Sequence, residues 1–368
     1  MRADVLVIGA GPAGIATAIA ARLKGLRVTV ADARRPPIDK PCGEGLLPEA
    51  VRSLRQLGID LNQCSAFPLG GICFTDESST ASAVIPKRTA FGIRRTALHQ
   101  LLIERALELG VSFHWGAQVT QHDPGCVRIN GNLANYDWLV GADGLHSRVR
   151  EWAGLNPRRK NHSRFGFRRH FELEPWTDIV QVYWGRRFEL VVTPVSPAEV
   201  CVSFFTSDPT LRIDAGLAQF PSLAARFKHA RALNSERGTV TSLLRPRAVC
   251  RGRLALVGDA SCAVDGIAGQ GMSLALQQAL ALAGALAGGN LNQYQAAHRE
   301  ICRIPVRLTR LLLAMDRSAW IRRKVLSLFA AMPPLFAKAI ALHTNEPGRE
   351  LFAAKDFFHL GWSFLHTR

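Results

Sequence analysis

A glycine-rich turn near the start of the chain has the residue types and spacing to bind a nucleotide. Gly9, Gly11 and Gly14 form G-x-G-x-x-G directly behind the apolar residues 5–8, and Asp32 closes a second apolar run. This order of strand, glycine turn, helix, strand and acid is typical of dinucleotide binding. Gly9 permits the tight turn, Gly11 lets the backbone approach a pyrophosphate, and Gly14 lets the helix pack on the strand. The free N–H groups at the helix start attract phosphate.

The residues around this turn extend the expected contacts but leave the nucleotide open. Asp32 would accept a hydrogen bond from a ribose hydroxyl. Arg34 and Arg35 follow it and could instead pair with a 2′-phosphate, as on NADP. The expected contacts of this segment are the three glycines, Pro12, Ala13, Asp32, Ala33 and Arg34.

Two glycine–acid segments further along suit a longer cofactor. Asp143-Gly144 follows an apolar run, so the glycine backbone can approach a pyrophosphate while the carboxylate orders nearby donors. Gly258-Asp259 follows another apolar run, and Asp259 could bond a ribityl hydroxyl. Either segment alone is more typical of a loop or a hairpin turn.

Two helix starts complete the set. Gly269 and Gly271 precede a long uncharged stretch, and their backbone N–H groups could face the anionic edge of a flavin ring. Arg95 precedes another helix and can contact phosphate or ribityl oxygens. The four segments in this order favour a flavin nucleotide more strongly than any of them does alone.

Composition bounds the class of protein. The chain has 368 residues, 48% of them hydrophobic, which suits roughly two domains. Its formal net charge of +17 favours anionic partners, but no zinc-type spacing, arginine-rich tract or RNA-binding signature supports nucleic acid, and no metal is expected. The eight cysteines are scattered without a C-x-x-C pair, which predicts reduced thiols in a cytoplasmic protein. A secretion signal over residues 5–21 is disfavoured by Asp4.

The elements that must position these residues divide the chain into three expected parts. Residues 3–32 predict strand, helix, strand, and residues 165–206 predict three or four antiparallel strands because they are rich in β-branched and aromatic types. Residues 272–298 predict a packed helix rather than a membrane span. The expected parts are a discontinuous nucleotide-binding domain (1–65, 93–155 and 246–300), a substrate domain (66–92 and 156–245) and a basic helical C-terminal region (301–368).

These motifs carry a family resemblance over roughly residues 1–300. The glycine turn, Arg95, Asp143-Gly144 and Gly258-Asp259 resemble the FAD-dependent aromatic hydroxylase (group A monooxygenase) superfamily. Residues 40–45 and 264–271 are similar to segments of its geranylgeranyl reductase-like branch, which includes isoprenoid reductases and monooxygenases of lipid-like phenols and quinones, often in type III polyketide (secondary-metabolism) pathways. Cys262, Gly266 and Gln270 depart from the usual patterns of these families.

The resemblance implies an α/β fold: a Rossmann-type FAD-binding domain, a second, antiparallel-sheet substrate domain and a helical C-terminal region. It implies FAD as cofactor, with NAD(P)H as a transient reductant that needs no second glycine motif. It adds Cys42, Gly43, Val119 and Met272 to the expected cofactor contacts. Cys42, placed near the flavin, is the candidate catalytic residue, with packing as the alternative. The substrate-pocket candidates are Gly45, His170, Tyr183 and Trp184, and strand alternation lets only one of the last two face a pocket.

The C-terminal region is basic and apolar. Arg303, Arg307 and Arg310 fall on one helical face, which suits either an anionic lipid surface or a solvated face of a packed layer. The first alternative places a cytoplasmic protein peripherally at the inner face of the membrane.

Three functions stay open at this point. The first is an NAD(P)H-dependent monooxygenase of a hydrophobic phenol, quinone or polyketide-like substrate. The second is a geranylgeranyl reductase-like enzyme that reduces a C=C bond in an isoprenoid or alkenyl substrate. The third is a non-enzymatic flavin-bearing binding protein.

Overall fold

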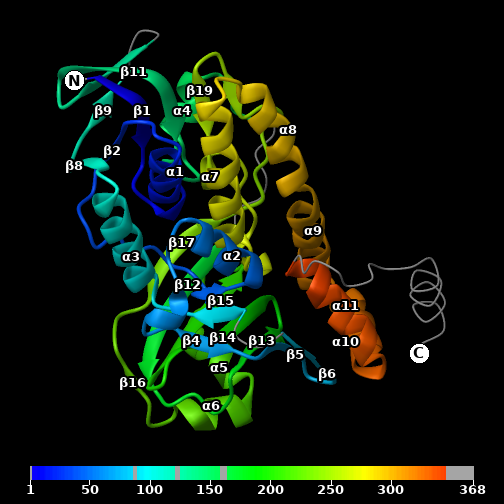
Figure 1. Cartoon of the computed structure of the whole chain (residues 1–368). Helices are drawn as coiled ribbons and strands as arrows, with labels where there is room; N and C mark the ends of the chain where they lie inside the picture. Colours follow the sequence, from blue (N-terminus) through cyan, green and yellow to red (C-terminus); the bar gives the residue numbers. More distant parts are fainter. Residues whose placement is uncertain (1, 86–88, 121–124, 158–163, 345–368) are drawn as a thin grey trace.

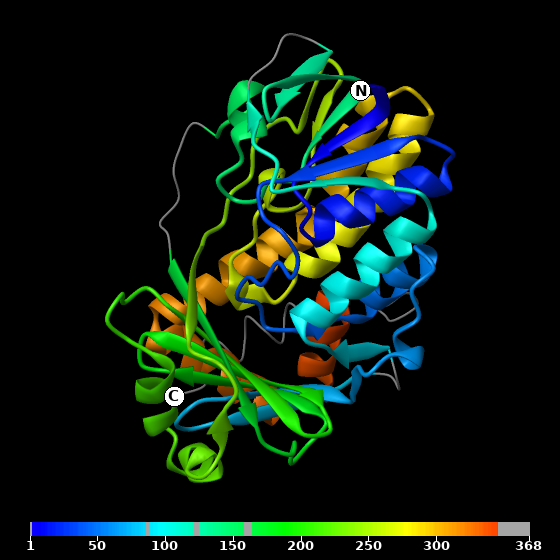
Figure 2. The ribbon, with the colours of Figure 1, turned by 90° about the vertical axis from the view of Figure 1, so that its left-hand side faces the viewer.

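Two large sheets lie at opposite ends of the molecule, with helices between and beside them (Figures 1 and 2). The computed structural model describes residues 2–85, 89–120, 125–157 and 164–344. The C-terminal part of the predicted basic region, 345–368, lies outside the described residues.

The first sheet carries the glycine turn. Its strands run in the order β18-β19-β11-β1-β2-β8, with β10 on β11 and β9 on β10, and the five from β19 to β8 are parallel. The strands are β1 (Arg2–Ile8), β2 (Val28–Asp32), β8 (Ser112–Trp115), β9 (Val119–Thr120), β10 (Cys126–Ile129), β11 (Asn132–Gly141), β18 (Cys250–Arg251) and β19 (Leu254–Leu256). The apolar run of β1 is buried, as expected for a parallel strand inside a sheet.

Helices pack on this sheet and begin at the cofactor motifs. They are α1 (Pro12–Leu23), α2 (Pro48–Gln56), α3 (Arg95–Glu108), α4 (Arg148–Trp152), α7 (Gly271–Ala287) and α8 (Leu291–Ile301). Helix α1 packs against α3 and α7. The uncharged stretch after residue 271 forms two helices instead of the one expected. Gly288 ends α7, Gly289 takes φ +67°, and the Asn290 side chain caps α8.

The second sheet runs β16-β12-β15-β14-β13-β5-β6, with β17 on β12. Its strands are β5 (Gly71–Thr75), β6 (Thr80–Val84), β12 (Arg164–Glu172), β13 (Ile179–Gly185), β14 (Phe188–Ser196), β15 (Glu199–Thr206), β16 (Arg231–Ala232) and β17 (Arg237–Thr241). The run 165–206 forms four strands, each antiparallel to its neighbour, as predicted. The sheet is nevertheless mixed, because β5 pairs in parallel with β13.

One face of the second sheet is covered and the other faces the first sheet. Helices α5 (Ile213–Ala218) and α6 (Pro221–Phe227) pack on the side of Leu190 and Phe204. Strand alternation turns Glu189 and Val191 to the opposite face. Short elements connect the sheets: β3 (Gly45–Leu46), β4 (Phe67–Leu69), β7 (Ala90–Gly92), and the 3₁₀ segments η1 (Leu61–Gln63), η2 (Gly258–Ala260) and η3 (Gly266–Ala268).

The basic C-terminal region forms three helices beside the second sheet (Figure 1). They are α9 (Arg303–Arg317), α10 (Ala319–Ala331) and α11 (Pro333–His343), and they contact β6 and η3. As predicted, the Pro333-Pro334 pair separates two helices. Among the residues described, no individual helix is long and apolar enough to span a bilayer. The pair α10–α11 reaches that length and composition jointly but is bent by 111°.

Candidate active site

A cavity of about 1210 Å³ opens between the two sheets. Segments from the whole described chain line it, including the glycine turn, residues 38–47, the start of α3, residues 142–146, and the loops around η2 and η3. Every residue predicted to contact the cofactor lines this cavity except Gly14. The convergence of these distant segments is what one extended cofactor would require.

Gly14 has a packing role in the turn, as predicted. A Cβ on Gly14 would lie 1.9 Å from the carbonyl oxygen of Gly9, so helix α1 could not approach the end of β1. Gly9 itself has φ +107°, and a Cβ there would lie 2.4 Å from the Ala142 carbonyl oxygen. Both glycines therefore let backbone meet backbone beneath the cavity.

A second group of glycines leaves open space on the cavity side. A Cβ built on any of them would meet nothing within 4 Å; they are Gly11, Gly43, Gly144, Gly269 and Gly271. All five line the cavity, and Gly11 and Gly271 stand at the N-termini of α1 and α7. The Nε atom of Arg95 is buried at the same cavity without a hydrogen-bond partner among the described residues. Open glycine backbone, two helix N-termini and an unpaired guanidinium donor fit an anionic dinucleotide such as FAD.

The predicted acids hold the loops in place. Asp32 accepts the N–H of Ala10 at 2.7 Å and that of Arg34 at 2.8 Å, so it orders the glycine turn from below. Asp143 accepts bonds from the Ser147 hydroxyl and two backbone N–H groups at the start of α4. Asp259 forms an ion pair with Lys40 at 3.0 Å. Each carboxylate has lone pairs left for a cofactor hydroxyl.

A buried histidine supports the glycine turn from α3. His99 is 1% exposed, and its Nε2 lies 2.8 Å from the carbonyl oxygen of Ala10, which can only accept, so the ring donates. Burial lowers the pKa of His99, although the Ala10 bond opposes the shift. The neutral ring therefore fixes the backbone next to Gly9 and Gly11.

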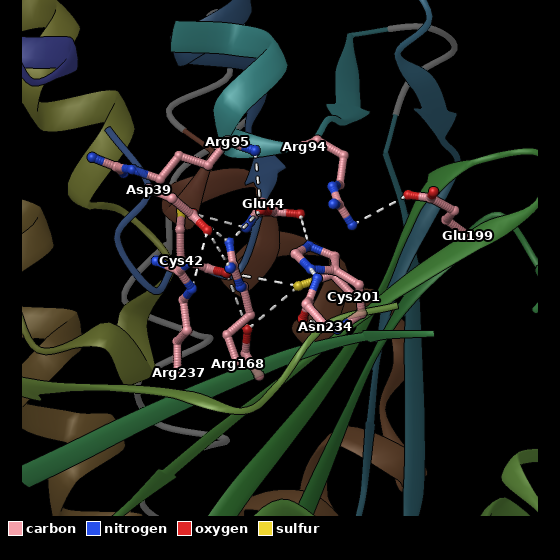
Figure 3. Close-up of polar contacts among 12 residues, drawn as sticks. Asp39, Cys42, Glu44, Arg94, Arg95, Arg168, Glu199, Cys201, Asn234 and Arg237 are labelled. Carbon is pink, nitrogen blue, oxygen red and sulfur yellow. Dashed lines mark hydrogen bonds and ion pairs between the residues drawn. The ribbon is translucent and has the colours of Figure 1, made fainter. Parts of the chain in front are cut away.

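The segment carrying Cys42 is clamped by a buried ionic cluster on β12 (Figure 3). Arg168, 2% exposed, donates to both oxygens of Asp39 at 2.8 Å and to Glu44 Oε1 at 3.1 Å. The N–H of Arg95 donates to the same Glu44 oxygen at 3.0 Å. Burial opposes ionisation of Asp39, but the bond and charge of Arg168 outweigh it and leave the pKa lowered. Glu44 has a positive φ of 58°, a strained conformation for a non-glycine residue, which these bonds hold.

His170 completes the cluster as a neutral donor. Its Nε2 lies 2.7 Å from Glu44 Oε2, while Asn234 Nδ2 donates to its Nδ1 at 2.9 Å. Asn234 Oδ1 accepts the His170 N–H, which fixes the orientation of the amide. The ligand-type atoms of Glu44, His170 and Cys201 lie within 4.8 Å of one another. The guanidinium of Arg168 already supplies the positive charge beside Glu44, so the cluster is a structural clamp.

The clamp also positions the backbone of Cys42. The Ser203 hydroxyl donates to the Cys42 carbonyl oxygen at 3.2 Å, and the Cys201 thiol contacts it at 3.7 Å. Burial raises the pKa of Cys201 well above its ordinary value, so that thiol stays protonated. Cys42 lines the cavity and its Sγ accepts the Glu44 N–H at 3.4 Å. All eight cysteines are free thiols.

Beyond the cofactor motifs the cavity widens into an apolar space, here called the chamber. It is bounded by the inner face of the second sheet and by α9, α10 and α11. Its walls include Ile72, Val182, Val191, Leu312, Met315 and Phe336. The basic C-terminal helices thus contribute apolar side chains to the site, while Arg303, Arg307 and Arg310 remain on the exposed side of α9.

The substrate-pocket candidates fare unequally. Gly45 lines the cavity, but His170, Tyr183 and Trp184 do not. His170 is taken up by Glu44 beneath the cofactor segment. Tyr183 and Trp184 do lie on opposite faces, as predicted, with Tyr183 against Phe220 on the covered face. Trp184 is on the chamber side but is buried behind Phe74, 1% exposed.

The sequence interpretation missed several residues. Glu44 was seen as part of a motif and Arg168 as a sheet residue, but their pairing across the fold was not predicted. Glu189, the one acid in the run 188–195, also lines the cavity and was overlooked. An acid inside an apolar strand was the available signal, because burial of a charge demands a reason.

Two departures from the family patterns have structural counterparts. A Cβ on Gly266 would lie 2.2 Å from the ring of Phe205, so this aromatic side chain occupies the space that a proline would need. Cys262 is buried in a small cluster with Cys302. The imidazole behind this loop comes from α8 instead, where His298 Nε2 lies 3.0 Å from Ser261 Oγ.

Comparison with known proteins agrees with this site. Residues 2–181 match the family described as FAD binding domain. The chain is 26% identical over 313 residues to the putative FAD-dependent monooxygenase YetM of Bacillus subtilis, which covers 76% of this chain and 83% of that protein. It is 26% identical over 328 residues to menaquinone reductase of Mycolicibacterium smegmatis, with 80% of this chain and 79% of that protein covered.

Solved structures show the same fold. A flavoprotein/dehydrogenase from Cytophaga hutchinsonii superposes with a TM-score of 0.81 at 18% identity, covering 94% of this chain and 93% of that one. A variant of Klebsiella pneumoniae HpxO complexed with FAD superposes with a TM-score of 0.74 at 20% identity, covering 94% and 98%. The predictions of fold class, of FAD and of an oxidoreductase are confirmed. The chain is an FAD-dependent oxidoreductase that belongs to the FAD binding domain family, within the group A flavoprotein monooxygenase superfamily.

Proposed function

We propose that this protein is an NAD(P)H-dependent monooxygenase that hydroxylates a hydrophobic phenol, quinone or polyketide-like molecule. The observation that carries the proposal is the continuity of one cavity from the glycine-lined cofactor section into the apolar chamber. A greasy ring in the chamber would lose water on entry, and burial of apolar surface favours binding by about 25 cal/mol per Å².

The chain's own residues bind, orient and exclude water. The open glycines and the N-termini of α1 and α7 would hold the phosphates and the ring edge of FAD, and Arg95 would donate to its oxygens. When bound, FAD supplies the redox chemistry, which is transfer of electrons from a nicotinamide and activation of dioxygen. The Arg168 clamp fixes the Cys42 segment at the cofactor, and the helices α9 and α11 close the chamber to solvent.

A second candidate is the reduction of a C=C bond in an isoprenoid or alkenyl substrate, as in the geranylgeranyl reductase-like branch. Two observations favour keeping it. Menaquinone reductase of Mycobacterium tuberculosis (strain H37Rv) is 56% identical to this chain, although over only 57 residues. Cys42 also lines the cavity, where a thiol could deliver the proton that alkene reduction requires.

We also propose that the protein is cytoplasmic and touches an anionic membrane through its C-terminal helices, where it would meet a greasy substrate. Arg303, Arg307 and Arg310 are exposed together on α9, and Trp320 is 59% exposed at the start of α10. Sedimentation with vesicles containing phosphatidylglycerol should carry the protein down at low salt, and a triple exchange of these arginines to Gln should abolish that.

Oxygen dependence tests the reaction itself. NADH and NADPH are offered to the FAD-loaded protein with a 5-alkylresorcinol or 2-methyl-1,4-naphthoquinone, in air and without oxygen. A monooxygenase consumes the nicotinamide with net turnover in air and places one ¹⁸O atom from ¹⁸O₂ in the product. Product formation without oxygen, with a gain of two hydrogens, would establish the reductase instead. Failure of either nicotinamide to bleach the flavin with any substrate would contradict both.

A further inference from the structure

The chamber contains a carboxyl group that the fold does not use. Glu189 projects from β14 onto the cavity and is 2% exposed. Its Oε2 atom has no hydrogen-bond partner among the described residues. Of the chamber walls formed by the second sheet and by α9–α11, Glu189 and His343 are the titratable residues within the described chain. Leaving a buried polar group unsatisfied costs about 1–3 kcal/mol, so its retention points to an external partner.

The charges behind Glu189 are already committed to one another. Arg164 of β12 donates to Asp265 at 2.7 Å and pairs with Asp316 of α9 at 3.2 Å. The side chains of these three residues are at most 6% exposed. One guanidinium therefore faces two nearer carboxyls, and Glu189 is a third acid without a cation of its own.

This arrangement keeps Glu189 uncharged. Burial raises the pKa of Glu189 well above its ordinary value, Arg164 opposes the rise, and Asp316 and Asp265 add to it. Burial also raises the pKa of Asp316. His343, the other titratable wall residue, is neutral because burial lowers its pKa to about 4. An uncharged carboxylic acid presents an O–H donor, which is a stronger hydrogen-bonding group than its own carbonyl.

We propose that Glu189 donates a hydrogen bond to a carbonyl oxygen of the substrate and so makes the chamber selective for hydrophobic quinone-type rings. The proposal rests on the proposed function, since it assigns the substrate contact of that same chamber. The apolar walls bind the ring without orienting it, and the acid at one place on the β14 wall fixes which edge of the ring is held. Selectivity arises because a hydrocarbon of the same shape would leave the acid unpaired.

Two matched probes test this on the oxidised, FAD-loaded protein. Binding of 2-methyl-1,4-naphthoquinone and of 2-methylnaphthalene is measured from the change in flavin absorbance, without nicotinamide. The variants are Glu189→Leu, which removes the donor, and Glu189→Gln, which keeps an N–H donor of similar size. Glu172→Leu, on the exposed side of the same sheet, is the control.

The wild type should bind the quinone more tightly than the hydrocarbon. Glu189→Leu should weaken quinone binding about tenfold, equivalent to about 1.4 kcal/mol, and leave hydrocarbon binding equal or tighter. Glu189→Gln should stay within about threefold of the wild type, and Glu172→Leu should change neither probe. Equal affinity of the wild type for both probes, or equal quinone binding by wild type and Glu189→Leu, would overturn the proposal. So would a parallel loss of both probes in the two Glu189 variants.

A measurement on the wild type alone guards against a leucine variant that does not fold. The infrared carbonyl stretch of the bound naphthoquinone should move to lower wavenumber than that of the free quinone, and an unmoved stretch would overturn the proposal. Because neither measurement involves oxygen or a reductant, their failure is distinguishable from failure of the hydroxylation assay.

Discussion

Arg168→Ala should destabilise the protein by about 3 kcal/mol and weaken FAD binding. Removing one partner of a buried ion pair typically costs about 3–5 kcal/mol, because the other charge stays buried without compensation. In this structure the side chain of Glu44 is 1% exposed and that of Asp39 is 18% exposed. Glu44 would keep its bonds from His170 and the Arg95 N–H, and Asp39 would keep Arg237 at 3.5 Å. The lower end of the range therefore applies.

The neighbouring residue provides a matched control. Arg169 points to the other face of β12 and pairs with Asp214, whose side chain is 70% exposed. Exposed pairs contribute about 0–1 kcal/mol, so Arg169→Ala should change stability by less than about 1 kcal/mol. Urea unfolding of the FAD-free forms gives the free energies, and a titration with FAD gives the change in affinity, expected to be about tenfold or more for Arg168→Ala alone.

A rescue experiment tests the stated cause. Exchanging Glu44→Gln in the Arg168→Met background removes the orphaned charge together with its partner, and should recover more than 1 kcal/mol of the loss by the logic of a double-mutant cycle. The reasoning is refuted if Arg168→Ala is no less stable than Arg169→Ala, or if the double variant is as unstable as the sum of the single ones.

Three further outcomes are expected. Gly11→Ala should leave the stability of the FAD-free protein within about 1 kcal/mol but weaken FAD binding, whereas Gly14→Ala should destabilise the FAD-free protein itself, because its Cβ would collide with the Gly9 backbone; equal behaviour of the two in urea unfolding would contradict this. Gly266→Pro should disturb the Phe205 ring and lower FAD affinity, and adding Phe205→Leu should restore part of it in the same titration. The lowered pKa of His99 means that the unfolded chain binds more protons just below pH 6.5, so stability should fall with acidification from pH 7 to 5. His99→Gln keeps a donor for Ala10 without titrating and should show a smaller fall; an identical pH dependence would exclude His99 as a cause.

The local elements and the cofactor loops could be predicted because their signals are local. A glycine turn must follow a buried strand, and helices stop at glycines such as Gly58 and Gly110 regardless of the rest of the fold. The acid Asp32 ends β2 at the position that the spacing required. These features depend on a few adjacent residues and on the periodicity of burial.

The ionic clamp and the chamber could not be predicted in the same way. Glu44 and Arg168 are 124 residues apart, and nothing in either neighbourhood specifies the other. Leu312 and Phe336 read as an ordinary apolar face of a basic helix, and their place in the chamber depends on how α9 and α11 pack on the second sheet. His170 looked available for a ligand because the pattern of a strand does not reveal what its inner face meets.

Strand β12 explains how the two ends of the cavity stay in register. Arg164 and Arg168 are four residues apart, so they share the inner face of the strand about 13 Å from each other. Arg168 holds the segment that carries Cys42, and Arg164 holds Asp265 at the start of η3 and Asp316 on α9. One strand therefore binds a loop on each side of the cofactor section and a helix of the chamber wall. Because the two arginines are separated by rigid extended backbone, any shift of the second sheet would move the Cys42 segment, η3 and the chamber wall together. The distance between the cofactor and a ligand held by Glu189 is thus set by the sheet rather than by the flexible loops.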